Sequence, residues 1–174
     1  MAKRVLILSA SVGSGHGTAG AALERAFRDI PGVEADHKDA LALASGLLRT
    51  TYSGVYFPMA RIAPWLMELG YQAQHRPFAT EPALPLWDRL NAAPLARLIR
   101  TFQPDITVCT HYMPANMVGH LLARGQIATS LAIATTDYDF HGSWFCQHFS
   151  RYFVALESTR AYCCALGLPA QRVV

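Results

Sequence analysis

The chain has 174 residues, of which 52% are apolar, enough for one well-packed domain and too few for two ordinary ones. Charged residues make up 16% and the formal net charge is +3, so the dense basic segments of nucleic-acid-binding proteins are absent and we expect no nucleic-acid partner. No stretch reaches the ~18 consecutive apolar residues of a membrane span. The four cysteines lack zinc-ligand spacing and predict reduced thiols in a cytoplasmic protein.

The N-terminal segment predicts a strand, a glycine-rich loop and a helix. Residues 5–9 form a continuous apolar run, as in a parallel strand that is covered on both faces. Residues 11–17 predict a loop, and from residue 18 apolar side chains recur with helical spacing as far as the turn at Pro31 and Gly32. Residues 33–37 predict a second, shorter strand.

Residues 41–75 predict an aromatic helical insertion that Pro58 and Pro64 break into shorter pieces. Tyr52 and Trp65 are candidates to line an apolar acceptor channel or a membrane-facing patch. The alternative is a helical hairpin that packs these aromatic side chains in the core. A loop is expected before a helix over 87–102.

The second half alternates between strands and helices. We expect strands at 105–110, 127–135 and 151–156, helices at 115–124 and 157–166, a helix cap at Gly167 and a further strand starting at 173. This alternation predicts an α/β fold, with a Rossmann-like parallel sheet and helices on both faces.

The loop after the first strand is a candidate anion site. Gly13, Ser14, Gly15 and Gly17 allow a ligand to approach the backbone, and the N-terminus of the following helix attracts an anion such as a diphosphate. His16 places an ionisable group on the tip of this loop. It is either functional or a residue that merely caps the helix or faces solvent.

Two familiar phosphate-binding loops fit this segment poorly. A P-loop needs a Lys before Thr18, and the dinucleotide fingerprint needs Gly or Ala in place of Thr18. Asp36, about twenty residues further on, could still bind a ribose and keeps the dinucleotide alternative open.

Polar side chains also follow two later strands. Asp137, Asp139 and His141 could together hold a divalent ion. However, residues two apart in a strand point to opposite faces, so we expect no metal and assign hydrogen-bonding and charge roles to Asp137 and His141. The segment 110–116, with His111, predicts another wall of the same crevice.

Several segments carry a family resemblance when they are taken together. They are Leu6 to His16, Pro104-Asp105, Thr110-His111, Thr136 to His141, Arg151 to Ala155, Gly167 to Pro169 and Arg172 to Val174. In this order they resemble the monogalactosyldiacylglycerol synthases and the related processive diacylglycerol glucosyltransferases.

The resemblance implies that residues 1–174 are the N-terminal, acceptor-side domain of a two-domain inverting glycosyltransferase of the GT-B type. It implies transfer of galactose or glucose from a UDP-sugar to a lipid such as diacylglycerol, without a cofactor. The C-terminal donor-binding domain is absent from this sequence, so the chain alone is expected to be inactive. The enzyme is expected in the cytoplasm, peripheral on the inner face of the cell membrane and in contact with its anionic surface.

The resemblance also assigns residues. His16 and Asp137 are the candidate catalytic residues, and the choice of base between them stays open. The glycine loop would bind the diphosphate through Gly13, Ser14, Gly15 and Gly17. The candidate acceptor-binding residues are His111, Thr136, His141, Trp144, Tyr52 and Trp65. Two other classes remain as alternatives: a dinucleotide-binding oxidoreductase domain that uses Asp36, and a non-catalytic lipid-binding or partner module.

Overall fold

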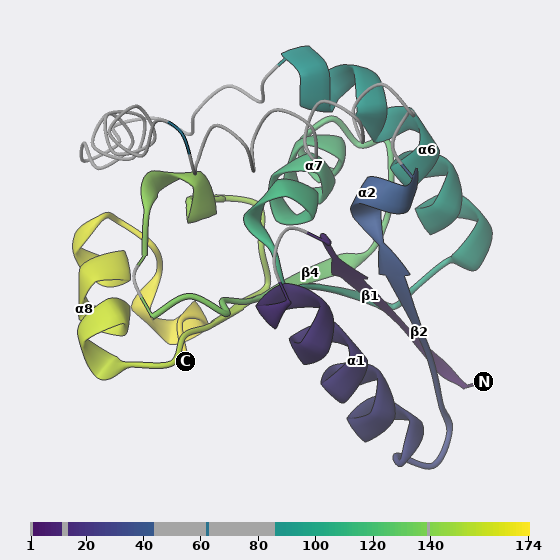
Figure 1. Ribbon diagram of the computed structural model, residues 1–174, viewed down its shortest axis with the longest axis horizontal. Coiled ribbons are helices and arrows are strands. Elements are labelled where there is room, and N and C mark those ends of the chain that lie inside the picture. Colours follow the sequence, from purple (N-terminus) through teal and green to yellow (C-terminus); the bar gives the residue numbers. More distant parts are fainter. Residues whose placement is uncertain (1, 12–13, 44–61, 63–85, 139) are drawn as a thin grey trace.

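The computed structural model describes residues 2–11, 14–43, 62, 86–138 and 140–174. Its described part contains one sheet of five parallel strands in the order β2-β1-β3-β4-β5 (Figure 1). The elements in chain order are β1 (Lys3–Ser9), α1 (Gly15–Arg28), β2 (Val33–Asp39), α2 (Ala40–Leu43), α6 (Leu86–Phe102), β3 (Ile106–Cys109), α7 (Tyr112–Ala123), β4 (Ser130–Ala134), η2 (Gly142–Trp144), β5 (Arg151–Phe153), α8 (Glu157–Ala165) and η3 (Ala170–Arg172).

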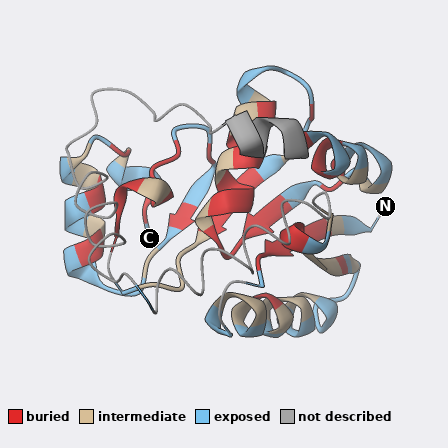
Figure 2. Ribbon diagram, turned by 45° about the horizontal axis from the view of Figure 1, so that its top comes forward, coloured by how far each residue is buried: buried red, intermediate tan, exposed pale blue. Residues whose placement is uncertain are grey.

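Helices cover both faces of the sheet because the central strands are apolar on both sides. In β1, Val5 and Ile7 point to one face, whereas Leu6 and Leu8 point to the other. On the first face they pack with side chains of α1, and on the second with side chains of α6 and α7. Figure 2 shows the buried residues along the strands and on the helix sides turned toward them. The predicted Rossmann-like α/β architecture is therefore confirmed.

Most predicted elements are present, with shorter strands than expected at β4 and β5. Gly167 follows α8 with a φ of +99°, and its N–H donates to the Cys164 carbonyl, as expected of a cap. Val173 forms a parallel bridge with Tyr152, so a strand does begin there. All four cysteines lie in the described part of the chain as thiols, and three of them are buried.

Two helices begin earlier than predicted. α1 starts at Gly15 rather than at residue 18, because the N–H and the hydroxyl of Thr18 both donate to the Ser14 carbonyl and close a first turn that contains two glycines. α7 starts at Tyr112 rather than at residue 115, because the first turn of a helix tolerates Pro114.

The predicted aromatic insertion begins in α2, but Tyr52 and Trp65 lie outside the described residues. Gly13 lies outside them as well. The roles predicted for these three residues, and the assignment of 1–174 as an acceptor-side domain, stay predictions.

Candidate active site

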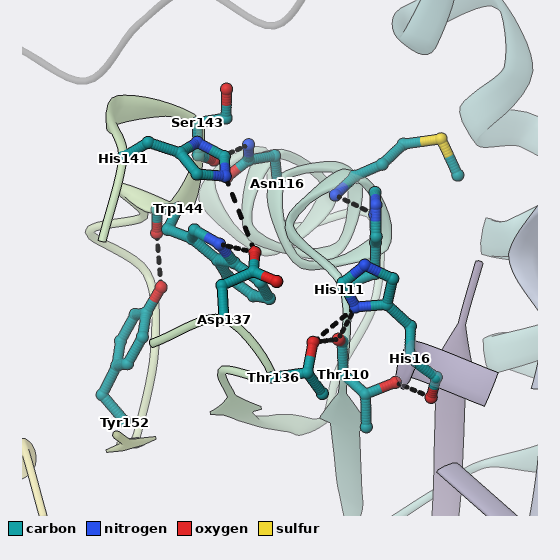
Figure 3. A network of polar contacts seen from close by, with 11 residues as sticks. His16, Thr110, His111, Asn116, Thr136, Asp137, His141, Ser143, Trp144 and Tyr152 are labelled. Carbon is teal, nitrogen blue, oxygen red and sulfur yellow. Dashed lines mark hydrogen bonds and ion pairs between the residues drawn. The ribbon is translucent and has the colours of Figure 1, made fainter. Parts of the chain in front are cut away.

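The site lies where the strand order of the sheet reverses. β1, β3 and β4 are parallel neighbours, so their carboxyl ends share one edge of the sheet. The chain goes from β1 to β2 on one side and later adds β3 on the other side of β1. In open α/β sheets a crevice forms at such a reversal, and ligands bind there. The N-terminus of α1 and the turns after β3 and β4 meet at this point (Figure 3).

His16 connects these elements. It is the second residue of α1, so the prediction that it lies on the tip of a loop was wrong. Its Nδ1 lies 3.0 Å from the Thr110 carbonyl oxygen and 2.5 Å from the Thr136 hydroxyl oxygen. The Thr110 hydroxyl donates in return to the His16 carbonyl at 2.9 Å. The imidazole is half-buried and is held in one orientation at the ends of β3 and β4.

His111 is buried beside His16 and caps α7. Its Nδ1 accepts the N–H of Met113 at 3.1 Å, and its ring meets the His16 ring edge-on with centroids 4.4 Å apart. Burial, and then the proximity of His16, lower the pKa of His111 from 6.5 to about 3. The ring is therefore neutral at pH 7, as it must be if Nδ1 is to accept a hydrogen bond. Only 1% of His111 is exposed, so any part in acceptor binding would lie in shaping the crevice.

Asp137 is the acidic group of the site. Its carboxylate accepts a hydrogen bond from the Trp144 indole N–H at 2.9 Å and lies 3.7 Å from His141 Nε2 (Figure 3). The contact with His141 is the largest influence on the pKa of Asp137, and together with Trp144 and the nearby His16 it lowers that pKa against the opposing effect of burial. Asp137 is therefore an anion at neutral pH, beside the imidazole of His16.

The short turn η2 presents Trp144 to Asp137. Asn116 Nδ2 in α7 donates to the Ser143 carbonyl at 2.7 Å, and the Tyr152 hydroxyl in β5 donates to the Trp144 carbonyl at 2.5 Å. Trp144 is 1% exposed, so its indole forms a fixed floor under the carboxylate. The turn is thus anchored from both α7 and β5. Asn116 and Tyr152 therefore fix the position of Asp137 indirectly, through Trp144.

The first turn of α1 leaves room at the edge of the crevice. A Cβ added to Gly15 or Gly17 would meet no atom within 4 Å, so packing does not require glycine at either position. Each glycine inside a helix costs about 1 kcal/mol relative to alanine. Ser14 is the N-cap residue, and the first N–H groups of any helix lack partners within that helix. The open space and these donors suit an anion.

Asp36 does not lie at the strand end, where the dinucleotide alternative needs it to bind a ribose. Asp36 pairs in register with Leu6 in the middle of β2 and makes an ion pair with Lys38 at 2.7 Å. It therefore lies three residues before the carboxyl end of its strand. The residue at that end is Asp39, whose carboxylate accepts the backbone N–H groups of Ser11 and Leu41.

The structure brings together six predicted site residues from four segments, namely His16, His111, Thr136, Asp137, His141 and Trp144. Sequence reasoning placed Thr110 and Asn116 in the segment that forms a wall of the crevice but gave neither a role of its own, and it gave none to Tyr152. Thr110 directly follows β3 and could have been found from its position at the strand end. Asn116 and Tyr152 donate hydrogen bonds to backbone carbonyls of η2, which is distant in the sequence, and no local sequence pattern predicts such a contact.

The described residues contain neither a cluster of metal ligands nor a helix that could span a membrane. Within the part of the chain that the structure describes, no group of three or more His, Cys, Asp or Glu side chains could hold a metal ion. Asp139 lies outside that part. Among the same described residues, no helix is long and apolar enough to cross a membrane.

Comparison with known proteins relates this chain to a family. The family model for monogalactosyldiacylglycerol (MGDG) synthase matches residues 16–174. Processive diacylglycerol beta-glucosyltransferases of Bacillus cytotoxicus and Bacillus cereus are each 25% identical over 171 residues, covering 98% of this chain and 43% of the relative. The chain therefore spans less than half the length of these relatives.

A solved structure supports the fold. The apo form of the lipopolysaccharide outer core galactosyltransferase WaaB superimposes with a TM-score of 0.56 at 13% identity, over 99% of this chain and 44% of that protein. The parallel sheet, this likeness and the match across nearly the whole chain agree with one another. The chain belongs to the monogalactosyldiacylglycerol synthase family.

Proposed function

We propose that this chain is the acceptor-side domain of an inverting glycosyltransferase that moves galactose or glucose from a UDP-sugar to diacylglycerol. The observation that carries the proposal is the imidazole of His16, oriented by Thr110 and Thr136 at the strand-order reversal. Membership of the MGDG synthase family and the named relatives support the substrate class.

The reaction needs a base and a site for the leaving group. In the proposed mechanism His16 removes the proton of the acceptor hydroxyl as its oxygen attacks C1 of the sugar. The bond between C1 and the diphosphate oxygen breaks, and its electron pair leaves with the UDP. Attack from the face opposite the leaving group inverts the configuration at C1.

The environment of Asp137 favours His16 as the base. The carboxylate of Asp137 already contacts Trp144 and His141, and its lowered pKa makes it a weak proton acceptor at neutral pH. The charges of Asp137 and His16 influence each other, so this anion instead stabilises the imidazolium that forms on His16 during transfer. We therefore assign Asp137 an electrostatic role.

The N-terminus of α1 is the proposed diphosphate site. Ser14 caps the open first turn, Gly15 and Gly17 lie in it, and Gly13 is proposed as a further residue of the site. The helix N-terminus can stabilise the charge that develops on the leaving diphosphate, so no metal or other cofactor is proposed. UDP-sugar enters only as the donor substrate.

The remaining roles concern the lipid and the membrane. We assign acceptor binding to His141 and the aromatic residues Tyr52 and Trp65, with His111 and Trp144 as the buried floor. Thr136, which the resemblance also assigned to the acceptor, instead contacts Nδ1 of His16. The enzyme would act in the cytoplasm as a peripheral protein on the anionic inner face of the membrane. Stronger co-sedimentation with anionic than with neutral vesicles, weakened by salt, is the expected result. Equal binding to both would contradict it.

A second domain would complete the enzyme. The relatives extend well beyond the length of this chain, and the described residues contain a candidate base and diphosphate site. We assign recognition of the uracil and ribose to a C-terminal donor domain.

Substitution of His16 tests the proposed function. In the enzyme that contains this chain, His16→Ala should lower turnover by about a hundredfold or more, as loss of a general base does. His120→Ala, the same change in the last turn of α7, is the matched control and should leave turnover near wild type. Turnover of UDP-sugar with diacylglycerol is the measurement, and wild-type-like turnover of His16→Ala would rule out His16 as the base.

A further inference from the structure

Two polar groups converge on one nitrogen of His16. The Thr110 carbonyl oxygen lies 3.0 Å and the Thr136 hydroxyl oxygen 2.5 Å from Nδ1, and the Thr136 hydroxyl also lies 3.4 Å from the Thr110 carbonyl as its donor. Figure 3 shows Thr110 and Thr136 side by side beneath the imidazole. The charged carboxylate of Asp137 is directed instead to Trp144 and His141.

The positions of the hydrogens follow from this arrangement. A carbonyl oxygen can only accept, so a hydrogen bond between Thr110 and Nδ1 requires a proton on Nδ1. The Thr136 hydroxyl then donates to the Thr110 carbonyl and accepts from the imidazole, which satisfies every group. If Nδ1 carried no proton, its lone pair would face the carbonyl lone pairs at 3.0 Å without a hydrogen between them. The neutral ring therefore carries its proton on Nδ1 and its lone pair on Nε2.

The threonines are themselves held in place. The Thr110 hydroxyl donates to the carbonyl of His16, and the N–H of Thr110 donates to the Leu8 carbonyl of β1 at 2.9 Å. Next to Thr136, the N–H of Thr135 donates to the Phe153 carbonyl of β5 at 2.9 Å. The groups that contact Nδ1 are thus fixed by the ends of the strands before any substrate binds.

We propose that Thr136 is a positioning residue which, with the Thr110 carbonyl, holds His16 in the Nδ1–H tautomer and makes Nε2 its basic nitrogen. The inference rests on the proposed function, in which His16 accepts the proton of the acceptor hydroxyl. When Nε2 takes that proton, the ring becomes a cation, and hydrogen bonds to charged groups are stronger than those to neutral ones. The contacts at Nδ1 therefore strengthen as the reaction proceeds and stabilise the transition state more than the ground state.

Nitrogen NMR of the His16 imidazole in this chain tests the tautomer without any substrate. In the wild type we expect a protonated Nδ1 and an unprotonated Nε2 at a pH where the ring is neutral. Thr136→Val should accelerate solvent exchange of the Nδ1 proton and increase the share of the other tautomer. Thr136→Ser should restore the wild-type spectrum. Thr135→Val, which removes the neighbouring hydroxyl that contacts the Phe153 carbonyl, should leave it unchanged.

Turnover provides the second readout. In the enzyme that contains this chain, Thr136→Val should lower kcat by about tenfold, the scale of one hydrogen bond, with KM little changed. Thr136→Ser should recover most of that loss.

A proton on Nε2 in the wild type, or a Thr136→Val spectrum identical to the wild type, would overturn the proposal. An unchanged kcat in Thr136→Val would overturn it as well. The NMR result stands whether or not the protein transfers sugar, so a failure of the proposed function is distinguishable from a failure of this inference.

Discussion

The His111 ring is packed against His16 and Tyr112, and its Nδ1 accepts the N–H of Met113, the second residue of α7. Protonation of Nδ1 would remove this acceptor and would place a charge in a site that is 1% exposed. The folded protein therefore resists protonation of His111, whereas the unfolded chain takes up a proton near the ordinary value of 6.5.

This difference predicts a pH-dependent stability. Because the folded pKa is about 3, the unfolded state binds one more proton between pH 6.5 and about 3, and stability falls as the pH is lowered through that range. The contribution of one such group approaches about 1.4 kcal/mol per pH unit. His111→Asn keeps a side-chain acceptor for the cap but removes the titration, so its stability should fall less steeply. Urea unfolding of the chain across this range measures both slopes, and equal slopes would contradict the assignment.

Part of the site was predictable one residue at a time. His16, His111 and Asp137 each follow a buried strand, and parallel strands bring their carboxyl ends to one edge. The hydrogen bonds of the Thr110 carbonyl were not predictable, because every residue has a carbonyl and only the fold selects this one. Histidine is also no preferred N-cap residue, so its role at α7 had no sequence signal.

Among the elements, α1 shows two kinds of glycine. At Gly20 the helix approaches β2 so closely that an added Cβ would lie 2.4 Å from His37 Nε2. That imidazole cannot move away easily, because its Nε2 lies 2.7 Å from the buried hydroxyl of Ser9. At Gly17 an added Cβ would meet nothing within 4 Å. Packing therefore requires glycine at 20 and not at 17.

Two alanine variants separate these cases. Gly20→Ala should lower the free energy of unfolding by about 1–3 kcal/mol, because the new methyl group forces His37 away from Ser9. Gly17→Ala, the matched control in the same helix, should raise it by up to about 1 kcal/mol, because alanine favours the helix. Urea unfolding of both variants is the measurement. A Gly20→Ala variant at least as stable as Gly17→Ala would contradict the packing role of Gly20.

The N-terminus of α1 also predicts the response to chelators. Since the helix supplies donors for the diphosphate and Asp137 is engaged by Trp144 and His141, turnover should be unchanged in EDTA. Activity should be compared before and after removal of divalent ions. Loss of activity that Mg²⁺ or Mn²⁺ restores would contradict the proposed diphosphate site.

Element types were more predictable than element boundaries. The apolar run of β1 and the helical spacing in α6 and α8 specify their conformations strongly. The starts of α1 and α7 were placed too late, because Gly15, Gly17 and Pro114 are poor helix residues in general but are tolerated in a first turn. In both cases the late start left a site residue in a predicted loop. His16 lies inside α1, and His111 caps α7.

The molecule as a whole brings the proposed base, His16, and the proposed diphosphate site to one sheet edge. A glycosyltransferase must also bind the nucleoside of its donor and exclude water while the sugar is transferred. A domain that closes over the crevice would meet both needs. The relatives are more than twice the length of this chain. The part of each relative that this chain does not match is therefore long enough for such a domain.

Transfer of labelled hexose from UDP-galactose or UDP-glucose to diacylglycerol tests the central claim most directly. The assay compares the 174-residue chain alone with the proposed enzyme, in which a donor domain follows these residues. We expect labelled glycolipid from the enzyme and none from the chain alone, although the chain alone should fold, because its strand and helix units bury a core of their own. Labelled glycolipid from the chain alone would show that the donor site lies within these residues. No labelled glycolipid from the enzyme would contradict the proposed function.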